Sequence, residues 1–396
     1  MSGTAGAAWS GRAVHVGLDV VPQSGGTTTA IGDFRRALGG RVVSFTAPAL
    51  VPAGAPDHVL HVPTTPGALG RLYGLAAGAP LERARAALAD ADLVLVHGLF
   101  RYHAQWATRH ARALGTPLWV VPHGGLDPYV FTYRAWQKRP WMAAVGRPMI
   151  ARAAAVVFAT GRERAKALPY TADARAAVVA WPTDPVDVAA RDAARPRARA
   201  RLGVPDNARL LLFVGRLHPL KRVLETIRLV AEIDDPRLHL AVVGPATSEI
   251  GEAECRGLAA SLGASHRVHV AGPLYGAEKS EAMLASDGFV SLSGKENFGY
   301  TVAEAMAHGL PLVLSPEIDL AHDVAGSAGR VGWLLRSSDP AEAARAVREF
   351  AAAPAALLAE LGARALAWAR DRLAPDRFGV ELRRLAHETA GPRDPR

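Results

Sequence analysis

The chain has 396 residues, of which 49% are hydrophobic, and this length suits two domains that each have their own core. Its formal net charge of +9 predicts an anionic partner, and nucleic acid, an anionic membrane and a phosphorylated substrate all satisfy that charge. The single cysteine, Cys255, excludes an internal disulfide and fits a reducing cytoplasm. Residues 1–12 lack a signal-peptide pattern and no apolar run reaches membrane-spanning length, so we expect a cytoplasmic protein.

Short apolar runs alternate with segments rich in Ala, Leu and Arg along most of the chain. Nearly every run is continuous, without polar alternation, which is typical of strands buried on both faces of a parallel sheet with crossover helices. The predicted strands of the first half are Val14–Val20, Arg41–Phe45, Leu93–His97, Leu118–Val121, Ala155–Ala159 and Ala177–Ala180. Those of the second half are Leu210–Val214, His239–Val243, Val268–Ala271, Gly288–Leu292 and Pro311–Leu314.

A composition shift and several prolines over residues 181–205 predict a linker between the halves, with part of Val186–Leu202 helical. We therefore expect an α/β protein of two Rossmann-like domains whose parallel sheets face each other across a cleft, with the site at the carboxyl ends of the strands. The predicted division is an N-terminal domain at residues 1–195, a C-terminal domain at residues 196–375, and a C-terminal helix and tail at residues 376–396 that pack back on the N-terminal domain.

A first charged cluster, Gly215-Arg216-Leu217-His218-Pro219-Leu220-Lys221-Arg222, lies where a predicted strand gives way to a helix that starts near Lys221. Arg216 offers a planar fork and Lys221 a compact charge, and the helix N-terminus favours phosphate, so the pair can clamp a diphosphate. The alternative is that both are solvated surface cations, which is the commoner fate of Arg and Lys.

A second cluster, Glu296-Asn297-Phe298-Gly299-Tyr300-Thr301-Val302-Ala303-Glu304, begins 80 positions after Arg216 and runs into a predicted helix. Its two carboxylates can hold sugar and ribose hydroxyls. Gly299 allows close approach of the backbone, so that free amides near residues 298–301 can point at a phosphate. A helix carboxylate that is merely favoured by the helix dipole is the alternative for Glu304.

In the first half, Gly25 and Gly26 lie in a loop, Val20 to Thr27, that ends a strand and starts a helix, where paired glycines let a ligand approach the backbone. The same pattern also fits an ordinary turn. His123 ends another buried strand, where it can hydrogen-bond a ligand or be structural, and His97 is a second strand-end histidine.

Together and in this order, the two clusters resemble retaining GT-B glycosyltransferases of family four, and the stretch His123 to Pro128 is similar to members that build exopolysaccharide or O-antigen chains. The resemblance implies transfer of a sugar, with retention of configuration, from a nucleotide-diphosphate sugar to a glycan or lipid-linked acceptor, without a metal or cofactor. It implies that Glu296 contacts sugar hydroxyls and Glu304 the ribose. The family usually has Gly at the positions of Arg222 and Asn297.

The residues expected to be catalytic are His123, Arg216, Lys221 and Glu296. Those expected to bind the donor are Gly25, Gly26, Gly215, Arg216, Lys221, Gly272, Leu274, Glu296, Asn297, Phe298, Gly299, Tyr300, Thr301 and Glu304. Two other functions fit such a chain: a GT-B sugar phosphorylase or epimerase, and a non-catalytic GT-B subunit that binds the acceptor.

The segment Tyr129–Lys166 interleaves basic residues (Arg134, Lys138, Arg139, Arg147, Arg152, Arg162, Arg164, Lys166) with aromatic ones and holds one acid, Glu163. This composition favours peripheral contact with an anionic membrane at its inner face, because polysaccharide assembly uses lipid-diphosphate acceptors. RNA, or a solvated face with buried tryptophans, would give the same composition, and we expect no nucleic-acid partner.

Asp90 and Asp92 have the spacing of a metal-binding pair, but they directly precede a buried strand, so we expect a helix-to-strand turn and no metal site. A phosphate-loop motif and zinc-ligand spacing are both absent from the sequence.

Overall fold

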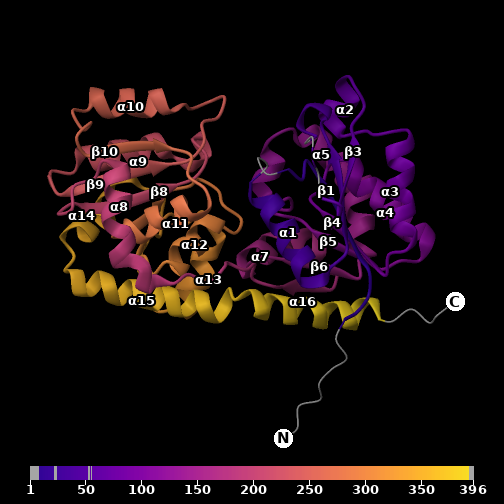
Figure 1. Ribbon diagram of the computed structural model, residues 1–396. Coiled ribbons are helices and arrows are strands. Elements are labelled where there is room, and N and C mark those ends of the chain that lie inside the picture. Colours follow the sequence, from indigo (N-terminus) through magenta and orange to yellow (C-terminus); the bar gives the residue numbers. More distant parts are fainter. Residues whose placement is uncertain (1–8, 22–24, 52–53, 55, 392–396) are drawn as a thin grey trace, which may run out of the picture. The chain divides into compact units, whose positions relative to one another are not determined.

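The computed structural model describes residues 9–21, 25–51, 54 and 56–391, and the statements below concern these residues (Figure 1). The chain packs as two compact units: Met1–Pro182 together with Pro375–Arg396, called unit 1 here, and Thr183–Ala374, called unit 2.

Unit 1 is built on a seven-stranded parallel sheet in the order β3-β2-β1-β4-β5-β6-β7. Its strands are β1 Ala13–Leu18, β2 Arg41–Thr46, β3 Val59–Pro63, β4 Leu93–His97, β5 Leu118–Val121, β6 Ala155–Phe158 and β7 Ala176–Val178. Its helices are α1 Gly26–Leu38, α2 Ala68–Tyr73, α3 Ala79–Ala89, α4 Tyr102–Leu114, α5 Ala135–Trp141, α6 Arg147–Ala151, α7 Gly161–Thr171 and α16 Pro375–Ala390. Figure 1 shows α3 and α4 side by side on one side of the sheet and α1 on the other.

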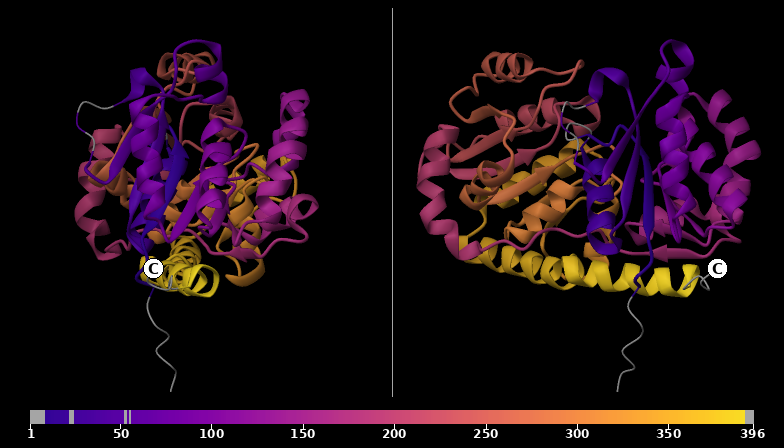
Figure 2. Two further views of the ribbon diagram at one scale, coloured as in Figure 1. Left: turned by 90° about the vertical axis from the view of Figure 1, so that its right-hand side faces the viewer. Right: turned by 45° about the vertical axis from the view of Figure 1, so that its right-hand side comes forward.

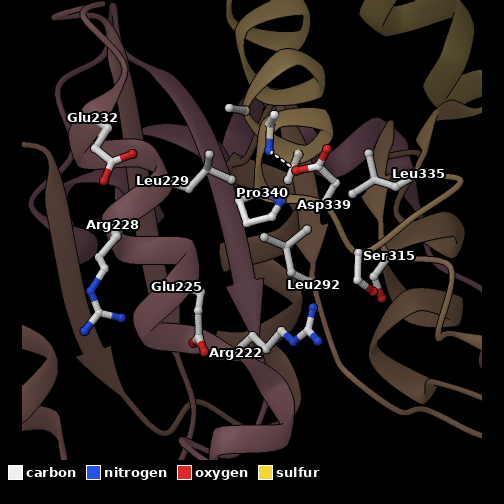
Figure 3. A pocket seen from close by; sticks show the side chains of 14 residues that line it. Arg222, Glu225, Arg228, Leu229, Glu232, Leu292, Ser315, Leu335, Asp339 and Pro340 are labelled. Carbon is white, nitrogen blue, oxygen red and sulfur yellow. Dashed lines mark hydrogen bonds between the residues drawn. The ribbon is translucent and has the colours of Figure 1, made fainter.

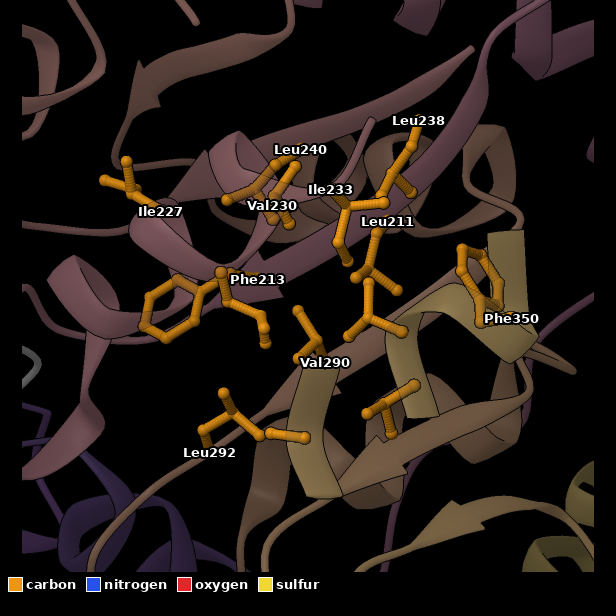
Figure 4. Close-up of a cluster of buried hydrophobic side chains, with 14 of the residues drawn as sticks. Leu211, Phe213, Ile227, Val230, Ile233, Leu238, Leu240, Val290, Leu292 and Phe350 are labelled. Carbon is orange, nitrogen blue, oxygen red and sulfur yellow. The ribbon is translucent and has the colours of Figure 1, made fainter. Parts of the chain in front are cut away.

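Unit 2 is built on a six-stranded parallel sheet in the order β10-β9-β8-β11-β12-β13. Its strands are β8 Arg209–Val214, β9 Leu238–Val243, β10 Val268–Gly272, β11 Gly288–Ser291, β12 Leu312–Leu314 and β13 Gly332–Leu334. Its helices are α8 Arg191–Leu202, α9 Val223–Glu232, α10 Glu252–Ser261, α11 Gly276–Ala285, α12 Tyr300–Ala307, α13 Asp319–Ser327, α14 Pro340–Ala352 and α15 Ala355–Arg372. Side chains of β8, β9 and β11 meet those of α9 and α14 in the core shown in Figure 4.

The two sheets follow the same plan. Numbered by their appearance within each unit, the strands run 3-2-1-4-5-6, and unit 1 adds a seventh strand at the edge. This is the strand order of Rossmann folds, in which the chain reverses direction across the sheet between the first and fourth strands. The prediction of two Rossmann-like parallel sheets is therefore confirmed.

Two edge strands, β3 and β13, are missing from the predicted set. Residues Val59–Pro63 include His61 and Pro63, so they lack the continuous apolar run of an inner strand. Most of them are only half-buried. Residues Gly332–Leu334 form a strand of only three residues. Edge strands tolerate polar residues and proline because one side of the backbone is unpaired, and composition therefore hides them.

The segment predicted to be a linker contains helix α8, within the stretch predicted to be partly helical, and from Thr183 on it belongs to unit 2, so the boundary falls at residues 182/183 and not at 195/196. Arg199 is fully buried; it ion-pairs with the Asp287 carboxylate at 2.9 Å and donates to the Ala285 carbonyl at 3.2 Å. The other carboxylate oxygen of Asp287 accepts from Arg195 at 2.8 Å. Removing one partner of such a buried pair is costly, so the pair fastens α8 to the strands of unit 2.

Helix α16 lies along α1 within unit 1 (Figure 2). The rings of Phe34 and Phe378 meet edge to face at 5.2 Å, and Arg383 donates to the Ala37 carbonyl at 3.0 Å. The indole of Trp119 in β5 donates to Thr389 at 2.9 Å.

Within the described residues no single helix is long and apolar enough to cross a membrane. The pair Pro340–Ala352 and Ala355–Ala390, bent by 114°, reaches the necessary length and composition as a pair.

Candidate functional site

In unit 2 the two charged clusters occupy neighbouring loops. Because β8 and β11 are paired and parallel, the loops that follow them leave the same edge of the sheet side by side. The Gly294 amide donates to the Leu220 carbonyl at 2.8 Å, and the Lys221 ammonium donates to the Glu296 carboxylate. The predicted phosphate-binding lysine and the predicted sugar-binding carboxylate therefore touch.

The other predicted donor residues of unit 2 lie at the same sheet edge. Gly215 directly follows β8, and the exposed Arg216 makes no hydrogen bond or ion pair with the described residues. Gly272 closes β10, its carbonyl accepts from the Gly244 amide at 2.9 Å, and the half-buried Leu274 follows.

Helix α12 begins at Tyr300, after Gly299 adopts the left-handed conformation with φ of 85°. Phe298 is buried at the start of the turn, Thr301 lies in the first helical turn, and the Asn297 side-chain oxygen is buried without a hydrogen-bond partner among the described residues. The left-handed backbone conformation costs free energy in a residue that has a Cβ atom, which explains the glycine before the helix.

Glu304 on α12 is held by one oxygen only. That oxygen accepts from the Lys279 ammonium at 2.6 Å, whereas the other is buried and has no hydrogen-bond partner in the described part of the chain. His308 fixes the end of α12, since one ring nitrogen contacts the Glu304 carbonyl at 2.6 Å and the other contacts Ser280 on α11 at 2.8 Å. Sequence reasoning missed Lys279, because Ala277-Glu278-Lys279-Ser280 is an ordinary surface-helix sequence.

The helix expected to start near Lys221 starts two residues later. Pro219–Lys221 form a short 3-10 turn, Arg222 adopts the left-handed conformation with φ of 53°, and α9 follows from Val223. The Arg222 side chain, at a position where the family usually has Gly, lines a cavity of about 580 Å³ that α9 and the start of α14 border (Figure 3). Arg216, Lys221, Glu296 and Glu304 do not line this cavity.

In unit 1 the two strand-end histidines come together. β4 and β5 are neighbours, and the His97 and His123 rings stack at 5.2 Å with a nitrogen–nitrogen distance of 3.0 Å. Burial lowers the pKa of His123 to about 3. The loop after His123 is fixed by Glu163, a buried carboxylate that accepts from the Gly124 amide at 2.7 Å and the Ala159 amide at 2.8 Å.

Glu163 was assigned only as the one acid of a basic segment, and its role in holding the His123 loop has no signature in the sequence. Gly25 has a positive φ of 73°, which favours glycine, before α1 starts at Gly26. The neighbouring Pro22, Gln23 and Ser24 of this predicted loop lie outside the described residues.

The rejected metal pair is a helix-to-strand turn, as predicted. Asp90 follows the end of α3, and an Asp92 oxygen accepts from the Arg12 amide at 2.7 Å just before β4. The described residues contain no group of three or more His, Cys, Asp or Glu side chains that could hold a metal ion.

The basic and aromatic segment is exposed over part of its length. Tyr129, Tyr133 and Trp136 are 49%, 63% and 75% exposed, which contradicts the alternative of a face with only buried tryptophans. The segment is not uniformly free, because Lys138 donates to the Val130 carbonyl at 2.7 Å and Lys166 ion-pairs with Asp127 at 2.9 Å. Arg134, Arg139 and Arg147 are exposed.

Comparison with known proteins identifies the family. Residues 7–183 match the profile of the glycosyl transferase 4-like domain, and residues 194–368 match that of the glycosyl transferases group 1. The two matches together cover most of the chain, which therefore belongs to the glycosyltransferases of this group.

Two relatives show what the chain is similar to. It is 33% identical to a D-inositol 3-phosphate glycosyltransferase of Streptomyces avermitilis over 68% of this chain and 60% of that protein. The match to the protein of the same name from Streptomyces scabiei is 35% over 70% of this chain and 64% of the relative. These alignments thus span less than two thirds of the relatives' own length.

Solved structures agree on the fold. Anabaena Alr3699/HepE in complex with UDP aligns with a TM-score of 0.75 at 18% identity, covering 95% of this chain and 100% of that one. WaaG, a glycosyltransferase involved in lipopolysaccharide biosynthesis, aligns with a TM-score of 0.68 at 16% identity, covering 96% and 99%. The GT-B fold is thereby confirmed.

The backbone of Arg222 gives a stability prediction. Arg222→Gly and Arg222→Ala both remove the side chain, but only Ala keeps a Cβ in the left-handed conformation. We expect the Gly variant to be more stable than the Ala variant by about 1 kcal/mol. At Arg228, inside α9, the same two substitutions are the control, and there Ala should be the more stable by about 1 kcal/mol. Thermal unfolding of the four variants checks this, and Ala ahead of Gly at position 222 would contradict it.

Proposed function

We propose that this protein transfers a sugar, with retention of configuration, from a nucleotide-diphosphate sugar to a glycan or lipid-linked acceptor. The observation that carries the proposal is the contact between Lys221 and Glu296. It sets a cation suited to a diphosphate against a carboxylate suited to sugar hydroxyls, at the edge of the sheet where Rossmann folds bind nucleotides.

The contacts of unit 2 leave room for a donor. A lysine ammonium has three donors, so Lys221 can keep its contact with Glu296 and also reach a phosphate oxygen. Arg216 has no partner in the described residues and can supply a bidentate contact. The unpartnered oxygen of Glu304 can accept from a ribose hydroxyl while Lys279 holds the other oxygen.

The proposed chemistry needs stabilisation of a leaving diphosphate more than it needs a protein nucleophile. In a front-face transfer, the bond from the anomeric carbon to the phosphate oxygen breaks, and the acceptor oxygen forms its bond on the same face. The departing phosphate oxygen takes the acceptor proton. Arg216 and Lys221 would stabilise the charge that develops on the diphosphate, and preorganised charges of this kind are usually the largest catalytic contribution.

The acceptor has two candidates. The resemblance favours a glycan or a lipid-linked sugar, whereas the two Streptomyces relatives carry the name D-inositol 3-phosphate glycosyltransferase and favour a small phosphorylated acceptor. The net charge of +9 suits both the phosphate of a small phosphorylated acceptor and the diphosphate of a lipid-linked one. A sugar phosphorylase or epimerase would share the donor site and differ in its product.

We further propose that the exposed residues Tyr129, Tyr133, Arg134, Trp136, Arg139 and Arg147, here called the basic-aromatic surface, contact anionic lipid at the inner face of a membrane from the cytoplasm. Exposed aromatic rings among arginines combine apolar insertion with attraction to acidic headgroups. A lipid-linked acceptor would be met at such a surface.

The reaction itself is the first test. The protein is incubated with α-linked UDP-, GDP- and ADP-sugars, starting with UDP-glucose because Alr3699/HepE has been solved in complex with it. Inositol 3-phosphate and a polyprenyl-diphosphate-linked sugar serve as acceptors. We expect ³¹P NMR to show release of the nucleotide diphosphate, ¹H NMR to show an α-linked product, and the rate to persist in excess EDTA.

Sugar 1-phosphate that forms only when inorganic phosphate is added would indicate a phosphorylase, and an epimerised donor would indicate an epimerase. A β-linked product would overturn retention. A rate that EDTA abolishes and magnesium restores would overturn the expectation that no metal takes part.

Glu304→Gln tests the ribose contact. The fold should survive, because Glu304 and Lys279 are each about a quarter exposed. Donor affinity measured by calorimetry should fall by about 1.5–3 kcal/mol, or roughly ten- to hundredfold, because a charged acceptor is lost. The control Glu254→Gln makes the same chemical change on the exposed side of α10 and should leave affinity unchanged. Equal affinities of the two variants would remove Glu304 from the site.

The basic-aromatic surface is tested with vesicles. Co-sedimentation of the wild-type protein with vesicles that contain acidic phospholipid should be strong at low salt and weak at high salt. Replacing Arg134, Arg139 and Arg147 with Gln should release the protein, while donor hydrolysis, which depends on unit 2, continues. The control replaces Arg345, Arg364 and Arg372, which are exposed on α14 and α15, and lowers the net charge equally. Wild-type protein that stays in the supernatant would make the surface an ordinary solvated face.

A further inference from the structure

Three histidines from neighbouring strands of unit 1 form a hydrogen-bonded row. His15 lies in β1, His97 ends β4 and His123 follows β5. The His15 Nε2 atom is 3.1 Å from the Gly39 carbonyl oxygen, and His15 Nδ1 is 3.4 Å from His97 Nε2. His97 Nδ1 is 3.0 Å from His123 Nε2. We call these three residues the histidine relay.

The relay is neutral at physiological pH. His15 and His97 are fully buried, and burial lowers the pKa of His15 to about 4 and that of His123 to about 3. Burial, reinforced by the neighbouring histidines, also holds the pKa of His97 well below its usual range. Among the described residues no carboxylate accepts from any of the three rings, so nothing compensates a positive charge there.

One carbonyl group fixes the position of every proton in the relay. A neutral imidazole has one N–H and one bare nitrogen. A carbonyl only accepts, so the N–H of His15 is at Nε2 and its Nδ1 is bare. His97 must then donate from Nε2, which leaves its Nδ1 bare, and His123 must donate from Nε2 to that atom. The Nδ1 atom of His123 therefore carries a lone pair.

That lone pair is unused. His123 Nδ1 is buried and has no hydrogen-bond partner among the described residues. Its ring is held in place by the stacked His97 and by Trp181, whose ring lies 4.9 Å away, and its backbone has the left-handed conformation with φ of 50°. Phe34 supports His97 edge to face at 5.2 Å, so the relay sits on the core between α1 and the sheet.

We propose that His15 and His97 are positioning residues that lock His123 into the Nε2–H tautomer, so that its Nδ1 accepts a hydrogen bond from a hydroxyl of the donor sugar. The sugar contact rests on the proposed function, whereas the tautomer does not. With the opposite tautomer, the same nitrogen would be a donor and would favour an acceptor such as a carboxylate or phosphate oxygen. The relay thus sets which chemical group His123 recognises.

The tautomer is measured by ¹⁵N NMR of the full-length protein with labelled histidine, and the His123 signals are assigned from their loss in His123→Gln. In the wild-type protein we expect an unprotonated Nδ1 and a protonated Nε2. His97→Phe keeps an aromatic ring but removes the acceptor, so the two tautomers of His123 should mix. His97→Asn places a side-chain oxygen near the former Nδ1 atom and should restore the single tautomer. His15→Phe removes the atom to which His97 Nε2 donates, so it should change the ¹⁵N signals of His97 more than those of His123.

A proton on Nδ1 of His123 in the wild-type protein would overturn the proposal. An unchanged His123 tautomer in His97→Phe would overturn it as well. If His97 served only to fill space, Phe would replace it better than Asn would. The proposal expects the opposite order, because only Asn can accept the hydrogen bond from His123.

The sugar contact is measured separately, as the ratio of the affinities for UDP-glucose and for UDP. We expect His97→Phe to lower this ratio about five- to tenfold, as loss of one hydrogen bond does, to leave the UDP affinity unchanged, and His97→Asn to recover most of the loss. If the protein binds UDP and His97→Phe leaves the ratio of the two affinities unchanged, the hydroxyl contact is overturned, but the proposed function is not. If the wild-type protein binds no nucleotide diphosphate or its sugar, the proposed function is overturned together with the hydroxyl contact, and the NMR result still decides the tautomer.

Discussion

The reversal of strand order within each parallel sheet determines where chemistry is possible in this protein. Between β1 and β4, and again between β8 and β11, successive crossovers run to opposite sides, so the loops after these neighbouring strands leave the sheet together. In unit 2 this joins Lys221 to Glu296 across 75 residues of sequence. In unit 1 the pairing of β1 with β4 sets His15, inside β1, beside His97 at the end of β4, and the next strand adds His123. The candidate site residues depend on this topology more than on local sequence.

The charged pairs of unit 2 fall into two kinds that differ in burial. Arg199 is buried and ion-pairs with Asp287; it also donates to the Pro205 carbonyl, while Asp287 accepts from the Leu210 amide, so the pair fastens α8 and its hydrogen-bonding groups are occupied. Lys221 with Glu296, and Lys279 with Glu304, are each roughly a quarter exposed and leave hydrogen-bonding capacity unused. An anionic ligand can therefore enter the second kind of pair without leaving a buried charge alone.

The sequence was sufficient for the parallel sheets and for the two clusters, because buried parallel strands are continuous apolar runs and the spacing of Arg216, Lys221, Glu296 and Glu304 is local information. It was insufficient for the supporting residues. Lys279 and Glu163 act through partners 25 and 39 residues away, and their own surroundings in sequence read as ordinary helix surface. Helix α8 was predicted only as the helical part of a linker, because its composition is rich in Arg and Ala, and only the contact with Asp287 reveals why the buried Arg199 belongs to a core. Contacts of this kind become visible only when the sheet order is known.

The two units carry different electrostatics, and the difference suits the proposed reaction. Unit 2 presents cations and carboxylates whose charges can hold a diphosphate and sugar hydroxyls. Unit 1 presents a neutral histidine, since burial lowers the pKa of His123 to about 3. A neutral ring locked by Gly39, His15 and His97 can accept a hydrogen bond from a hydroxyl through its bare Nδ1, so the burial of the histidine relay determines which chemical group His123 binds.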